Sequence, residues 1–82
     1  MGRPKRIKLV LRKLGRESAV GLSYGNGLIE IDPRQTPQDL MDTIIHECLH
    51  ECFDSMSEED VENAATTIMR VLWRQNYRKV DQ

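Results

Sequence analysis

Ile44-Ile45-His46-Glu47-Cys48-Leu49-His50 is the stretch that decides how this chain of 82 residues is organised. Apolar residues recur in it at helical spacing, and its two histidines are four residues apart. Residues at that spacing lie one above the other on the same face of a helix, so both imidazoles can reach one ion. Because neutral imidazole nitrogens are good zinc ligands, the stretch predicts a helix that carries half of a metal site.

Glu47 follows the first of these histidines directly and completes the pattern His-Glu-x-x-His. It lies about a quarter of a turn round the helix from His46, so it can reach a water on the metal without binding the ion itself. A carboxylate in that position can act as a general base. His46 and His50 are the only histidines of the chain, which favours a metal site over a chance arrangement.

The third ligand is predicted to be a carboxylate on a second helix, because a catalytic zinc site uses three protein ligands and no third histidine exists. A metzincin would carry that histidine six residues after His50, where this chain has Met56. If two helices form an antiparallel hairpin that turns near Met56, Glu62 comes to the level of His50. We therefore rank Glu62 first and Glu58, which is closer to the turn, second. Carboxylates in a first helical turn are also favoured by the helix dipole alone.

The residues before the motif predict a small sheet. Three segments alternate apolar and polar residues with the period of a strand, and Gly25-Asn26-Gly27 separates the last two as a turn that tolerates positive φ. We expect a mainly antiparallel sheet of about three strands, followed by two helices, in an α+β fold. The expected strands are Ile7–Arg12, Ala19–Tyr24 and Leu28–Asp32.

Two helices are expected after the sheet. Thr36 is a predicted N-cap with Pro37 at the first helical position, and this helix runs to about Phe53. Ser57 is the predicted N-cap of the second helix, which runs to about Trp73 or Tyr77.

Length and composition point to one small domain over residues 1–82, with residues 1–6 as a mobile basic tail. No apolar run is long enough to span a membrane, and the basic start is not a signal peptide. Cys48 and Cys52 are four residues apart on one helix, where a disulfide would stabilise little. Reduced thiols, small and buried, in a cytoplasmic protein are therefore expected.

The segment from about Ile29 to Tyr77 also carries a family resemblance. His46-Glu47-Cys48-Leu49-His50, with Glu62-Asn63-Ala64-Ala65 further on, resembles the zincin-type metallopeptidases. The resemblance is greatest to the minimal gluzincins and the small SprT-like proteins of phage and bacterial genomes. It implies a zincin-like fold, one zinc ion per chain, hydrolysis of a peptide or protein substrate, and Glu62 as the ligand glutamate. It also implies that Leu28–Asp32 lies along the cleft and binds an extended peptide by β-addition.

Three functions follow from these patterns. The first is a zinc-dependent metallopeptidase with His46, His50 and Glu62 as metal ligands and Glu47 as general base. The second is a non-catalytic, zinc-stabilised binding module that contacts DNA or a protein through its basic N-terminus. Residues 1–16 carry seven basic side chains and no acidic one, and Gly2-Arg3-Pro4 resembles the core of an AT-hook. The third is a structural domain without a metal.

Overall fold

The computed structural model describes residues 2–80. A short sheet comes first in the chain and two helices follow, as the sequence predicts. The elements, in chain order, are β1 (Lys8–Leu11), the short 3-10 helix η1 (Gly15–Glu17), β2 (Gly21–Ser23), β3 (Leu28–Ile31), α1 (Pro37–Cys52) and α2 (Glu58–Arg74).

The sheet is mixed, with strand order β1-β3-β2. β3 pairs in parallel with β1 and antiparallel with β2, so the expectation of a mainly antiparallel sheet is wrong. The sheet is mixed because the last strand in the chain, β3, lies between the first two. The tight turn at Gly25 and Gly27, both with positive φ, folds β3 back along β2. The longer connection through η1 keeps β1 and β2 apart, and β3 fills the space between them.

The central position of β3 overturns a second expectation. The resemblance implies that Leu28–Asp32 binds a peptide by β-addition, which needs an unpaired strand edge, but β3 has a neighbouring strand on each side. Its backbone groups are therefore engaged within the sheet. The strand with a free edge next to α1 is β2.

One face of the sheet packs on α1. Ile29 and Ile31 of β3 are fully buried there, and Gly21 and Ser23 of β2 lie beside them in the register. Leu9 of β1 pairs with Ile29 and shares this face, yet it is 39% exposed. The difference arises because α1 packs against β2 and β3.

Both helices begin where the sequence predicts. The hydroxyl of Thr36 accepts a hydrogen bond from the Asp39 amide (3.2 Å), and that of Ser57 accepts one from the Asp60 amide (3.1 Å). Each side chain thus satisfies one of the amides that a helix start leaves without a partner. α2 ends at Arg74, close to the first of its two predicted ends.

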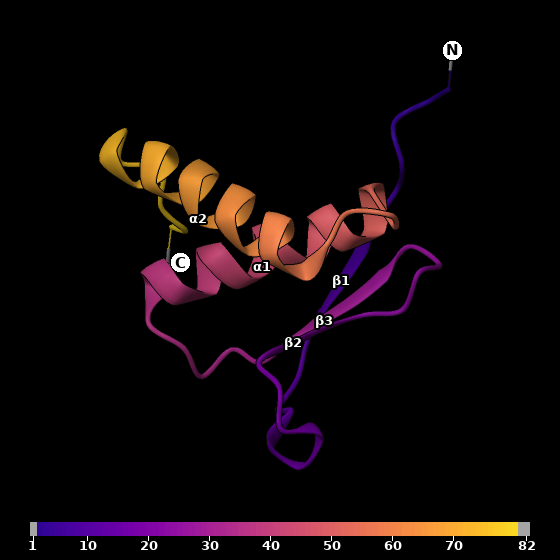
Figure 1. The fold of residues 1–82 in the computed structure, drawn as a ribbon. Helices are drawn as coiled ribbons and strands as arrows, with labels where there is room; N and C mark the ends of the chain where they lie inside the picture. Colours follow the sequence, from indigo (N-terminus) through magenta and orange to yellow (C-terminus); the bar gives the residue numbers. More distant parts are fainter. Residues whose placement is uncertain (1, 81–82) are drawn as a thin grey trace.

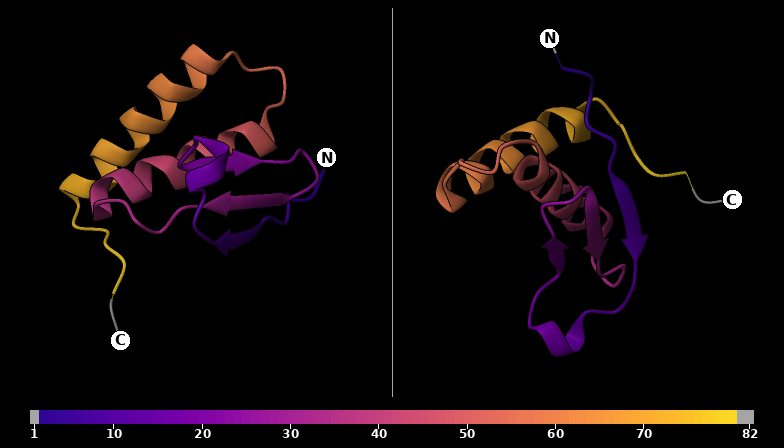
Figure 2. Two further views of the ribbon diagram at one scale, coloured as in Figure 1. Left: turned by 90° about the horizontal axis from the view of Figure 1, so that it is seen from below. Right: turned by 90° about the vertical axis from the view of Figure 1, so that its right-hand side faces the viewer.

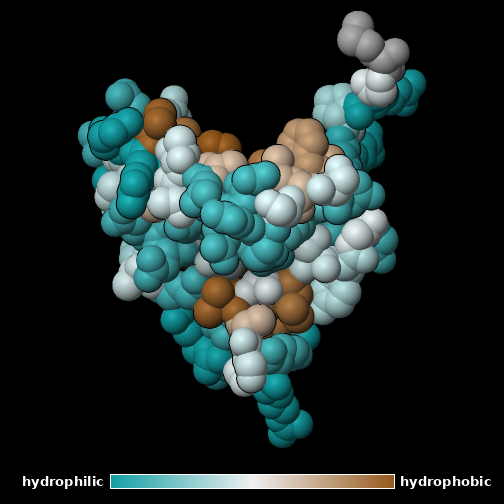
Figure 3. Space-filling model, in the orientation of Figure 1, coloured by the Kyte–Doolittle hydropathy of each residue, from teal (hydrophilic) through white to brown (hydrophobic). Residues whose placement is uncertain are grey.

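The helices and the sheet form three layers, with α1 in the middle (Figures 1 and 2). α2 packs on α1 through a buried stripe of Val61, Ala65 and Met69, spaced by four residues. Hydrophilic side chains cover most of the face seen in Figure 3, and apolar atoms show in a few small areas. None of the helices within residues 2–80 has the length and apolar character needed to cross a membrane.

Two smaller expectations are also tested. Both cysteines are free thiols, but Cys52 is exposed and Cys48 only half-buried, so the expectation of two buried residues is wrong for Cys52. Cys52 is the last residue of α1, at the end of the helix.

Within residues 1–6, the segment expected as a mobile tail, Lys5 contacts α1. Its ammonium donates a hydrogen bond to the backbone carbonyl of Glu51 (2.7 Å).

Candidate metal centre

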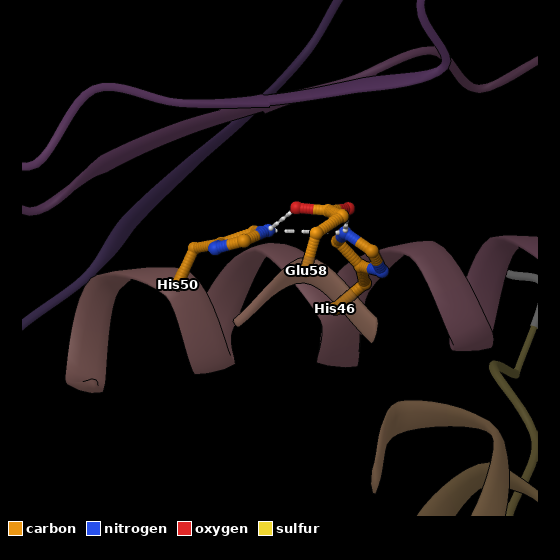
Figure 4. Close-up of side chains that lie close together, drawn as sticks. All are labelled: His46, His50 and Glu58. Carbon is orange, nitrogen blue, oxygen red and sulfur yellow. Dashed lines mark hydrogen bonds and ion pairs between the residues drawn. The ribbon is translucent and has the colours of Figure 1, made fainter. Parts of the chain in front are cut away.

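His46 and His50 lie on the face of α1 that looks toward the sheet, one helical turn apart (Figure 4). Their Nε2 atoms are 3.1 Å apart, and the ring planes meet at 63°. The two side chains are 19% and 25% exposed, so both are shielded from solvent and still reachable. The helical spacing thus brings the imidazoles to one point, as the sequence predicts.

Glu58 completes the group from the first residue of α2 (Figure 4). Its Oε1 is 2.8 Å from Nε2 of His46, and its Oε2 is 2.8 Å from Nε2 of His50. One ligand atom from each of the three residues can be chosen so that all lie within 4.8 Å of one another. Two imidazoles and one carboxylate therefore converge from two helices.

Glu62, which the sequence analysis ranks first as third ligand, is not a member of this group. The burial of α2 gives the physical reason. Val61 faces α1 and is fully buried. Glu58 precedes Val61 by three residues and lies about 60° round the helix from it, so it points more nearly toward α1 than Glu62, which lies about 100° from Val61 on the same side. α2 also begins next to His50, since Glu58 is its first residue and contacts that imidazole. The first turn of α2, rather than the second, therefore reaches the two histidines.

The donor set fits a zinc ion. Zinc binds imidazole nitrogen and carboxylate oxygen at about 2.0–2.1 Å in a tetrahedral arrangement, which places neighbouring ligand atoms ~3.3 Å apart. Here the two Nε2 atoms are 3.1 Å apart, and each is 2.8 Å from an oxygen of Glu58. These separations are a few tenths of an ångström shorter than the tetrahedral value. With each histidine in the tautomer that leaves Nε2 unprotonated, two nitrogens and two oxygens with lone pairs face one another here, and a shared cation stabilises such an arrangement.

Glu47 lies beside this group and is 8% exposed. Within residues 2–80, no hydrogen bond to its carboxylate is found, and Gly21 of β2 lies against it. Burial raises the pKa of Glu47 above its usual value, and the nearby histidines act in the opposite direction. A carboxylate with a raised pKa beside a metal site suits a general base or acid.

Glu51 is a residue of this face that the sequence analysis missed. Its fully buried side chain accepts hydrogen bonds from the Ser23 hydroxyl and from the amides of Gly25 (2.5 Å) and Gly27 (2.7 Å). The hydrogen bonds, led by that of Ser23, lower its pKa to about 2. Glu51 thus fastens the β2–β3 turn to α1. Its position four residues after Glu47 was the available signal, since both lie on one face of the helix.

Two cavities flank the group and meet at it. The larger, of about 1250 Å³, lies beside Ser18–Gly21, and the smaller, of about 550 Å³, lies beside Gly21–Gly25. Gly21, His46, Glu47 and Glu58 line both. The site therefore sits in the middle of a cleft that follows β2.

Within residues 2–80, neither tyrosine of the chain forms a hydrogen bond with His46, His50 or Glu58. The hydroxyl of Tyr24 donates to the carboxylate of Glu30, on the sheet face that points away from α1. Tyr77 lies beyond the end of α2 and is 64% exposed.

Comparison of the chain with protein-family models, with curated proteins and with solved structures finds no match. The site's residues and their geometry are therefore what a functional assignment rests on.

Proposed function

We propose that this chain is a small zinc-dependent peptidase, in which His46, His50 and Glu58 hold one zinc ion and Glu47 is the general base. The observation that carries the proposal is the convergence of two imidazole nitrogens and a carboxylate within 4.8 Å, with a buried carboxylate on the adjacent residue of the same helix. This combination matches a catalytic zinc site, which has three protein ligands and one open position.

A zinc ion bound there would polarise the scissile carbonyl and make a neighbouring water more acidic. Glu47 lines the meeting point of the two cavities and can take a proton from a water in the cleft. Its raised pKa suits both proton transfers, because the same carboxyl group can take the proton from the water and then give it to the leaving amine. The low exposure of Glu47 limits competing contacts with bulk water.

The free edge of β2 is the proposed binding surface for the peptide. β2 is an edge strand that lines both cavities, so an extended peptide paired with it would pass over Glu47 and the two histidines. Backbone pairing with a sheet edge holds a peptide extended largely without regard to its sequence. Gly21 brings the strand close, because it has no side chain between β2 and the Glu47 carboxylate.

We propose a cytoplasmic location, because Cys48 and Cys52 are four residues apart on one helix, where a disulfide would stabilise little.

The test compares wild type with Glu47→Gln, purified without an affinity metal and then loaded with zinc. Zinc stoichiometry is measured by elemental analysis, and cleavage of unfolded casein by mass spectrometry of the products. We expect one zinc per chain in both proteins, and a loss of at least about 100-fold in cleavage rate for the variant.

Equal cleavage by the two proteins would mean that Glu47 is not the base. Zinc binding without any cleavage by wild type would favour the non-catalytic binding module instead. A protein that takes up no zinc would leave only a structural domain.

A further inference from the structure

The larger cavity differs from the smaller one in charge. Its lining includes six carboxylate side chains and a single cationic one, that of Arg34. The carboxylates come from the residue that follows β3, from α1 and from α2: Asp32, Asp39, Asp42, Glu47, Glu58 and Glu62. The smaller cavity has three, of which two are the shared Glu47 and Glu58.

The one cation does not offset this charge. Arg34 donates through Nε (3.0 Å) and Nη2 (2.7 Å) to the two carboxylate oxygens of Asp32. These bonds hold the pKa of Asp32 well below its usual range, and they engage the guanidinium in an internal pair. Within residues 2–80, Asp39 and Glu62 form no ion pair. The cavity therefore carries a net negative charge.

A second observation, at Glu47, points to a ligand in the cleft. Glu47 is more than nine-tenths buried and lines the cavity, yet its carboxylate has no hydrogen-bond donor within residues 2–80. Because no fully buried side-chain oxygen within residues 2–80 lacks a partner, the Glu47 carboxylate oxygens must open onto the cavity, where a ligand can supply the missing donor. Low-dielectric walls that carry one sign of charge also concentrate the electric field in a cleft.

The direction of β2 fixes which part of a bound peptide enters this cavity. β2 runs from Gly21, at the larger cavity, toward Gly25 at the smaller one. A peptide paired antiparallel with β2 runs the opposite way, so the part that follows the scissile bond lies in the larger cavity. Antiparallel pairing is the slightly more stable of the two arrangements per residue.

We propose that the larger cavity is a subsite for basic side chains, which makes peptides with Lys or Arg after the scissile bond the preferred substrates. This inference rests on the proposed peptidase function. The larger cavity has a volume of about 1250 Å³, which exceeds that of a typical small-ligand pocket, so it has room for more than one long side chain.

The test uses three fluorescein-labelled decapeptides that differ only in two adjacent residues of the C-terminal half: Lys-Lys, Gln-Gln or Glu-Glu. A fourth carries Lys-Lys in the N-terminal half. Binding to zinc-loaded Glu47→Gln protein is measured by fluorescence anisotropy at low salt and at 0.5 M salt, and cleavage by wild type is measured in parallel. We expect the C-terminal Lys-Lys peptide to bind about tenfold more tightly than Gln-Gln at low salt, and the preference to shrink at high salt.

Two double variants, made in the same Glu47→Gln background, assign the preference to this cavity. Asp39→Asn with Glu62→Gln removes two lining carboxylates and should abolish most of the preference. Asp60→Asn with Glu59→Gln is the matched control, because Asp60 has the same capped position in α2 that Asp39 has in α1, and neither control residue lines either of the two cavities. The control should keep the preference.

The outcomes separate the subsite from the peptidase. Equal binding of all peptides, or equal binding of the two Lys-Lys peptides, would overturn the subsite even if wild type cleaves them. Selective binding without cleavage would support the subsite and overturn the peptidase function. A preference that the control double variant also loses would overturn the assignment to this cavity.

Discussion

Gly21 of β2 lies directly against Glu47 of α1: a Cβ placed on residue 21 would stand 2.9 Å from Oε2 of the Glu47 carboxylate. The same Cβ would be 2.7 Å from the Cγ2 methyl of Thr43. Real Cβ atoms do not approach other atoms so closely, so only glycine fits between the edge strand and the helix. The distance between the proposed peptide-binding edge and the proposed base depends on this residue.

Gly21→Ala should therefore move β2 away from α1 or push Glu47 out of place. We expect a loss of about 1–3 kcal/mol in the free energy of unfolding, the usual range for a side chain forced into a packed interior. The rate of casein cleavage should also fall in protein that is still folded, because the carboxylate of Glu47 is displaced from the cleft. Urea unfolding and casein cleavage measure the two effects.

Gly15→Ala is the control for this change. A Cβ at residue 15 would meet only Nη2 of Arg34, at an ordinary 3.5 Å, so stability should change by no more than about 0.5 kcal/mol. If the two variants behaved alike, the close approach of Gly21 would have no special role.

The choice between Glu58 and Glu62 as zinc ligand gives a second prediction. Glu58→Gln should weaken zinc binding at least about tenfold, because it removes the charged ligand whose oxygens lie 2.8 Å from both imidazoles. Glu62→Gln should change it less than about twofold. Isothermal titration with zinc gives both constants, and Glu59→Gln corrects for the loss of one acidic side chain in the first turn of α2. A larger effect at Glu62 would restore the ranking made from the sequence.

Zinc should also stabilise the fold, since it joins α1 to the start of α2. A ligand present at 100 times its dissociation constant adds about 2.7 kcal/mol to the free energy of unfolding. For a domain of this length, that raises Tm by about 10 °C or more. Differential scanning calorimetry with and without a chelator tests this. In His46→Ala/His50→Ala the rise should disappear, and a rise that persists would place the zinc elsewhere.

Glu51 predicts a pH effect on stability in the absence of metal. Its pKa in the folded protein, about 2, is below the value of an unfolded glutamate. The carboxylate therefore contributes stability that is fully present above the unfolded pKa and is lost as the pH falls from about 5 through 2. Thermal unfolding of the chelator-treated protein across this range should show the loss.

Glu51→Gln should remove that part of the pH dependence and lower Tm at pH 7 by at least about 4 °C, because the turn amides and Ser23 lose a charged acceptor. Glu59→Gln, on the exposed first turn of α2, is the control and should leave the acid profile unchanged. An unaltered profile in Glu51→Gln would assign the acid sensitivity to other carboxylates.

Local features of this protein could be predicted because they depend on residues close together in the chain. The caps at Thr36 and Ser57 act within one helical turn, and the turn at Gly25 and Gly27 needs only positive φ. His46 and His50 face one way because four residues make about one turn of a helix. Half of the candidate metal site was thus visible in seven consecutive residues.

Long-range features were decided by the tertiary structure. Alternation along a strand predicts which residues share a face but not which strand becomes its neighbour, so the central place of β3 and the free edge of β2 were not predicted. Which carboxylate of α2 meets the imidazoles depends on how the two helices pack, which the buried Val61 stripe determines. Helical spacing fixes the geometry within one element, whereas the third ligand, the hydrogen bonds of Glu51 and the contact of Gly21 with Glu47 form only when separate elements pack together.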